Sequence, residues 1–127
     1  MPFPIDKKFI EQTEKELQVS FPALYKTKME AENGGQVEFE DIHFILYPFF
    51  DQSNKKRISR TCNHIGLETQ KAKEWNNFPN NATAIGSDGG GNQLVLIHTG
   101  DYKLLETIYF WDHETGELEE VSKSIIK

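Results

Sequence analysis

Short apolar runs separated by glycine-rich turns fill the last third of the chain, and no other pattern constrains the fold as strongly. The apolar runs span residues 82–86, 93–99 and 104–111. The turn signals are Ser-Asp-Gly-Gly-Gly-Asn at 87–92, Gly-Asp at 100–101 and Glu-Thr-Gly-Glu at 114–117. Apolar runs bounded by Gly, Asn and Asp are typical of antiparallel strands joined by turns. The sequence therefore predicts a β-meander, and residues 94–97, which are all apolar, predict a strand covered on both faces.

The N-terminal part of the chain follows the helical period instead. Residues 7–17 place apolar side chains on one stripe, and Asp6 precedes them as a residue type that caps helix N-termini. A second helix is expected to begin near Phe21-Pro22, because proline is well tolerated in a first turn. Asn33-Gly34-Gly35 is expected to end it, since glycine adopts the left-handed conformation of a helix exit. Two antiparallel helices should therefore precede the sheet.

The remaining segments complete a single-domain α+β architecture. At 127 residues the chain has room for one hydrophobic core and no surplus for a second. We expect one domain over residues 1–127, with an antiparallel or mixed sheet and helices packed alongside it. The further predicted elements are strands at 37–39 and 42–47, an exposed loop at 51–62, and helices at 64–77 and around Leu118, Val121 and Ile125.

Acidic residues dominate the charge of the chain. The net charge is −6, from 20 acidic and 14 basic residues. Between residues 101 and 120 seven acidic side chains accompany one basic side chain, Lys103. Nucleic acid is a poor partner for such a surface, because its binding requires Lys and Arg to neutralise phosphates. Two interpretations stay open: ordinary solubility, or electrostatic steering toward a basic protein partner.

The cysteine count and the apolar pattern indicate a compartment. Cys62 is the single cysteine of the chain, so an internal disulfide and a cysteine-based zinc cluster are excluded. No basic segment followed by a long apolar run is present at the N-terminus, so no signal peptide is expected. No apolar stretch approaches the roughly 18 residues of a membrane span. We expect a cytoplasmic protein with no membrane partner.

The glycine-rich segment Asp88–Asn92 is the feature that most suggests a phosphate-binding loop. A phosphate loop requires a helix directly after the glycines, and usually a lysine within the motif. Here a strand is predicted to follow and no lysine is present. We therefore expect a strand connection with positive φ angles, in which Asp88 and Asn92 satisfy backbone amides of the turn. No cofactor is predicted.

Other reactive groups give weak support for catalysis. Adjacent residues of a strand point to opposite faces, so Asp112, His113 and Glu114 are poorly placed to bind one metal ion. Asp88 and Asp112 would form an oxygen site for calcium or magnesium if their strands align, and solvated acids at a strand end are the alternative. Cys62 and His64 are near neighbours, whereas catalytic Cys–His pairs assemble across a fold. We predict no catalytic residue and no metal ligand.

The large aromatic residues are expected to form the core, with one exception. The core candidates are Phe39, Phe44, Trp75, Tyr109, Phe110 and Trp111. Phe49 and Phe50 differ because they follow a proline at the edge of a polar segment. They are expected either to fold back over the sheet or to present an apolar patch to a partner.

The order of these motifs resembles the SUKH superfamily, which includes the yeast Smi/Knr-type cell-wall assembly regulators and many small bacterial proteins. The resemblance spans nearly the whole chain, although many relatives have a helix-ending glycine where this chain has Gln18. It is carried by Glu11-x-x-Glu14-x-x-Leu17, Phe21-Pro22-x-x-Tyr25, Asn33-Gly34-Gly35, Pro48-Phe49-Phe50, Ala84–Asn92 and Ile108–Glu114.

The resemblance implies an α+β scaffold that binds another protein. Bacterial members of the superfamily resemble immunity proteins, which neutralise a cognate toxin domain, often a nuclease. The expected partner is a basic toxin domain encoded beside this protein. An intracellular regulatory or scaffolding module is the alternative, and a metal-dependent hydrolase using Asp88 and Asp112 is a third hypothesis. From charge and turn location, the expected contacts are Asp88, Asp101, Asp112, Glu114 and Glu117, with Phe49 and Phe50 as apolar anchors.

Overall fold

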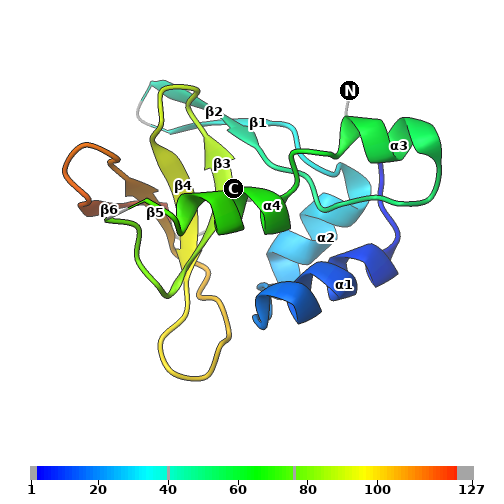
Figure 1. The fold of residues 1–127 in the computed structure, drawn as a ribbon, viewed down its shortest axis with the longest axis horizontal. Coiled ribbons are helices and arrows are strands. Elements are labelled where there is room, and N and C mark those ends of the chain that lie inside the picture. The colour runs from blue at the N-terminus through cyan, green and yellow to red at the C-terminus, as the bar shows by residue number, and fades with distance from the viewer. Residues whose placement is uncertain (1–2, 40, 76, 123–127) are drawn as a thin grey trace.

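Four helices and a six-stranded sheet form the part of the chain that the structure describes. The structure is a computed structural model, and it describes residues 3–39, 41–75 and 77–122. The helices are α1 (Lys7–Leu17), α2 (Ala23–Ala31), α3 (Lys55–Arg60) and α4 (Ile65–Ala72). The strands are β1 (Gln36–Phe39), β2 (Ile42–Leu46), β3 (Ala82–Ser87), β4 (Gln93–Ile97), β5 (Ile108–Trp111) and β6 (Leu118–Ser122). The predicted α+β class is confirmed (Figure 1).

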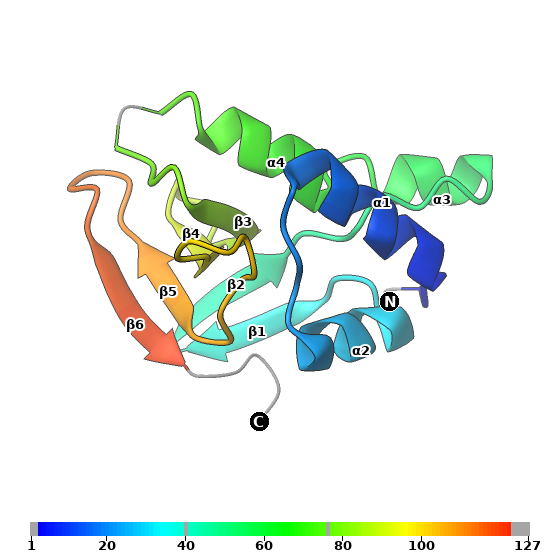
Figure 2. The ribbon, with the colours of Figure 1, turned by 90° about the horizontal axis from the view of Figure 1, so that it is seen from below.

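The strands follow one another across the sheet in chain order. Each strand pairs with its sequence neighbour, and all five pairings are antiparallel. Figure 2 shows the curl of the sheet, with α1, α2 and α3 near one side and β5 and β6 on the other. The predicted meander is therefore confirmed, and β1 and β2 extend it.

Apolar side chains from the helices and from the concave sheet form one core. Gln93–Ile97 is buried at every position, as expected for a strand covered on both faces. Helix α4 packs on β3, where the hydroxyl of Thr69 accepts a hydrogen bond from the amide of Ala84 at 3.0 Å. No helix in the described residues is long and apolar enough to cross a bilayer. The largest fully buried side chains include Ile10, Met29, Phe44, Phe49, Ile65, Ile85, Leu94 and Trp111.

Helix α1 begins with the predicted N-cap and ends at a residue in the left-handed conformation. The side chain of Asp6 accepts a hydrogen bond from the amide of Lys8 at 3.0 Å, which caps α1. Gln18 ends the helix with φ 57°, in the left-handed region. Glycine adopts this conformation without strain, whereas a residue with a Cβ atom does not.

Two predicted segments differ from the structure. The segment 51–62, expected to be a loop, contains α3, whose N-terminus is capped by the side chain of Asn54. No residue of α3 is buried, so the helix has no apolar stripe to reveal it in the sequence. Leu118–Ser122 is strand β6 rather than a helix, because it pairs with β5. Ile125 lies outside the described residues.

Candidate functional site

Three loops meet at one end of the sheet. In an antiparallel sheet, the β3–β4 turn and the β5–β6 turn lie at the same end, and the pairing of Gln93 with Trp111 places them side by side. The segment that follows α4 contacts the β5–β6 turn, as Figure 2 shows. We call the resulting area the three-loop surface. It comprises residues 73–75, 77, 87–92 and 112–117.

Hydrogen bonds join two of the loops to each other and attach the third to the end of β5. The side-chain oxygen of Asn92 accepts from the amide of His113 at 3.1 Å and lies 2.7 Å from Nδ1 of the same residue. The proton of the His113 ring is therefore assigned to Nδ1, because two acceptors cannot bond to each other. The indole Nε1 of Trp111 donates to the carbonyl of Asn77 at 3.2 Å. These bonds hold the loops in one arrangement.

Two glycines allow the loops to approach this closely. Gly116 has φ +77°, and a Cβ atom there would lie 2.6 Å from Cβ of Asn77. Gly91 has φ +104°, and a Cβ atom there would lie 3.1 Å from the ring of His113. Any other residue would meet backbone strain at both positions, and at residue 116 it would also clash with Asn77. The glycines of the turns therefore shape the surface.

Two tryptophans line a cleft beside the three-loop surface. The indole rings of Trp75 and Trp111 are stacked, with centroids 5.4 Å apart and an interplanar angle of 8°. Trp111 is buried as predicted, but Trp75 is 42% exposed, so the prediction that it belongs to the core is wrong. We call the adjoining cavity of about 420 Å³ the tryptophan cleft. It is lined by Glu74, Trp75, Asn77, Gly91, Trp111 and His113.

The charge of the three-loop surface is strongly negative. Within its residues five side chains are acidic and one, Lys73, is basic. Asp88 and Asp112 are half-buried and accept hydrogen bonds from backbone amides of their own turns, as predicted for Asp88. The acidic residues are Glu74, Asp88, Asp112, Glu114 and Glu117.

The other expected contact residues lie elsewhere. Asp101 belongs to the connection between β4 and β5, at the opposite end of the sheet, beside Lys103. Phe50 is half-buried and stacks on the ring of His64, with centroids 4.5 Å apart. Phe49 is fully buried, so the expectation that it contacts a partner is corrected: its ring packs against Phe21 in the core.

Asp88 and Cys62, the groups considered above for a metal site or a nucleophile, are both described by the structure. Both oxygens of Asp88 accept hydrogen bonds, from Gly90 and from the side chain of Asn92. In the described part of the chain no three His, Cys, Asp or Glu side chains are grouped closely enough to hold a metal ion. Cys62 is exposed on the turn after α3.

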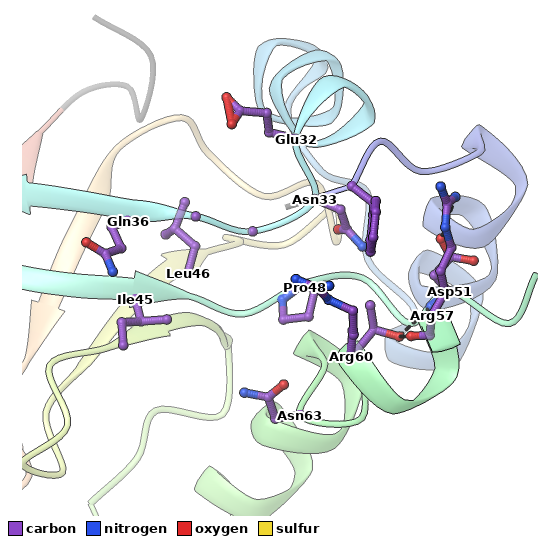
Figure 3. A pocket seen from close by; sticks show the side chains of 14 residues that line it. Glu32, Asn33, Gln36, Ile45, Leu46, Pro48, Asp51, Arg57, Arg60 and Asn63 are labelled. Carbon is purple, nitrogen blue, oxygen red and sulfur yellow. Dashed lines mark hydrogen bonds and ion pairs between the residues drawn. The ribbon is translucent and has the colours of Figure 1, made fainter. Parts of the chain in front are cut away.

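A second cavity, of about 560 Å³, lies between the β1–β2 pair and α3 (Figure 3). Its charged lining is balanced, with two acidic and two basic side chains. Arg57 pairs with Asp51 at 3.4 Å and lies over the ring of Phe3, 4.8 Å from its centroid. Because the two basic and two acidic side chains balance, the lining of this cavity has no net charge that would select a charged partner. The charged residues are Glu32, Asp51, Arg57 and Arg60.

Comparison with known families identifies the chain. A model of the SMI1 / KNR4 family (SUKH-1) matches residues 4–127. The chain belongs to this family. The resemblance inferred from the motifs is thereby confirmed for the whole SUKH-1 domain. No curated protein matches the chain.

The motifs that marked this chain as a SUKH member also build most of the three-loop surface. Residues 84–92 supply the β3–β4 turn, and residues 108–114 supply Trp111, His113 and part of the β5–β6 turn. The third loop was missed by sequence reasoning, because Glu74 and Trp75 were included in a predicted helix. The sequence signal for this loop is Trp75, a large aromatic residue beside acidic and polar neighbours.

Proposed function

We propose that this SUKH-1 protein is an immunity protein that binds a cognate toxin domain and neutralises it. The observation that supports this proposal is the three-loop surface, where five acidic side chains and an exposed tryptophan lie on a hydrogen-bonded framework. Toxin immunity proteins are among the members of the SUKH group, which makes a protein partner the first expectation for this chain.

Inhibition of a nuclease toxin would need no chemistry from the inhibitor. A nuclease attracts the negative phosphates of its substrate with a basic surface. A rigid acidic surface complements the same charges, which speeds association and excludes acidic competitors. The exposed indole of Trp75 adds the type of aromatic contact that often dominates binding energy in protein interfaces. The toxin would then be blocked by occupation of its substrate-binding surface.

Co-expression with the polypeptide encoded beside this protein tests the proposal. We expect growth arrest by the neighbour alone and rescue when both are present. Glu114→Lys combined with Glu117→Lys should abolish rescue. Glu11→Lys combined with Asp101→Lys is the matched control, because it changes the net charge equally at the opposite end of the molecule and should retain rescue. Affinity should fall as salt concentration rises.

The immunity proposal fails if the neighbouring polypeptide is harmless, or if it stays lethal in the presence of this protein. A pull-down from the native cell that recovers a cellular regulator instead of a toxin fragment would support the regulatory alternative. An affinity that does not change between low and high ionic strength would contradict the role of the acidic surface.

A further inference from the structure

The tryptophan cleft has properties that set it apart from the rest of the exposed surface. The Trp75 side chain is exposed although tryptophan is the largest residue type, and its ring lies parallel to that of Trp111. The Trp111 indole is itself fixed by its hydrogen bond to Asn77. An exposed aromatic ring in a fixed orientation loses little conformational entropy when a partner covers it.

The electrostatic setting of the cleft indicates the charge of its occupant. Glu74 lines the cleft directly, and the adjoining turns carry Asp112 and Glu114. His113 also lines it, but Nδ1 of its ring is engaged by Asn92. An apolar occupant would remove water from these carboxylates without giving them a partner, which is unfavourable. An acidic occupant would be repelled.

The chemistry of the cleft fits a guanidinium group better than an ammonium group. A cation over the face of an indole is attracted by the negative charge of the ring face. The planar guanidinium group also stacks on aromatic rings and donates paired hydrogen bonds to carboxylates. The cleft offers both features, in the ring of Trp75 and the carboxylate of Glu74.

We propose that the tryptophan cleft receives an arginine side chain of the partner protein, stacked on Trp75 and paired with Glu74. This inference rests on the proposed function, in that the arginine belongs to the bound toxin domain. It adds the position of the central contact and the residue type that the partner supplies.

Affinity measurements with the co-purified toxin domain test the contact. Trp75→Leu keeps an apolar side chain but removes the aromatic face, and we expect binding to weaken about 3- to 30-fold. Trp75→Phe should bind more tightly than Trp75→Leu. Tyr102→Leu is the control, because Tyr102 is 60% exposed at the other end of the sheet and should leave affinity unchanged. Unchanged unfolding midpoints show that each variant is folded.

A second measurement does not depend on the toxin. In NMR titrations at low salt, a nona-arginine peptide should shift the indole N–H resonance of Trp75, assigned through Trp75→Phe. The same peptide with citrulline in place of arginine has nearly the same shape without the charge, and should leave the resonance in place. Equal shifts with both peptides, or no shift with either, would overturn the arginine proposal.

The two experiments separate the two proposals. If the toxin binds and Trp75→Leu leaves its affinity unchanged, the arginine contact is wrong and the immunity function stands. If no toxin binds and the arginine peptide still shifts the Trp75 resonance, the cleft binds arginine and the immunity function is wrong.

Discussion

The side-chain amide of Asn33 forms two hydrogen bonds with the backbone of Phe49. Its Oδ1 atom accepts from the Phe49 amide at 2.7 Å, and its Nδ2 atom donates to the Phe49 carbonyl at 2.8 Å. Both residues are buried. The pair fixes the chain that leaves β2 against the exit of α2, and it directs the ring of Phe49 toward Phe21 and Tyr25. This contact explains why Phe49 is a core residue.

Asn33→Ala should lower the free energy of unfolding by about 2–4 kcal/mol, because it leaves a buried amide and a buried carbonyl without partners. Urea denaturation measures the change. Asn63→Ala, at an exposed position, is the control and should stay within about 0.5 kcal/mol of the native protein. An Asn33→Ala protein as stable as the control would contradict this account of the Asn33–Phe49 pair.

Gly116→Ala should destabilise the protein more than Gly89→Ala. Both glycines have positive φ angles, so each substitution adds backbone strain of about 1 kcal/mol. A Cβ atom at residue 116 also meets Asn77 at 2.6 Å, whereas one at residue 89 meets nothing within 4 Å. We expect a total cost of about 2–3 kcal/mol for Gly116→Ala, measured by urea denaturation. Equal costs would show that the loops do not depend on this close approach.

Stability should fall as the pH falls below about 6.5, the ordinary pKa of histidine, because of His64. Nδ1 of His64 accepts a hydrogen bond from the amide of Leu67 at 3.2 Å and caps α4. Burial lowers the pKa of His64, and the nearby carboxylates of Glu16 and Glu68 oppose this shift only in part. The unfolded chain therefore binds the proton more readily than the folded protein, so the stabilisation is complete above pH 6.5 and is lost toward the lowered pKa.

Urea midpoints measured between pH 8 and pH 5 check the role of His64. His64→Asn supplies a side-chain oxygen that caps the helix and does not titrate, so its midpoint should depend less on pH in this window. If the native protein and His64→Asn show the same slope, the pH dependence comes from other groups.

Thr69→Val should cost about 1–3 kcal/mol of stability, although the two side chains have similar shapes. The hydroxyl of Thr69 accepts from the amide of Ala84, in a part of β3 that β2 does not reach. Valine would leave this buried amide without a partner. Thr69→Ser keeps the hydroxyl and should lose less stability than Thr69→Val, as measured by thermal or urea unfolding. A Thr69→Val protein as stable as the native protein would contradict this role of the hydroxyl.

Local sequence signals predicted most of the fold. Helix α1 has both an N-cap and an apolar stripe, and the strands of the meander are bounded by glycine-rich turns. Helix α3 has a cap but no buried residue, so no periodicity marked it. The three-residue spacing of Leu118 and Val121 predicts a helix where the structure has strand β6. Its conformation is determined by pairing with β5, which a local pattern does not encode.

The candidate site was predicted only in part, because a local sequence pattern does not encode which strands pair. Four of the five expected acidic contacts lie in two turns that the strand pairing brings together. Asp101 is separated from them because the strand direction reverses before it. Trp75 is a large aromatic residue within the helix predicted over residues 64–77, which is why the sequence places it in the core. Helix α4 ends at Ala72, so Trp75 lies beyond the helix and reaches the solvent.

The neighbour-to-neighbour order of the strands has a consequence for the timing of folding. Each strand needs only the strand made just before it, so the sheet can assemble in step with synthesis on the ribosome. The β5–β6 turn leaves the ribosome near the end of this sequence and supplies three of the acidic residues. The three-loop surface is therefore completed only when β5 and β6 pair, after the first four strands have been synthesised.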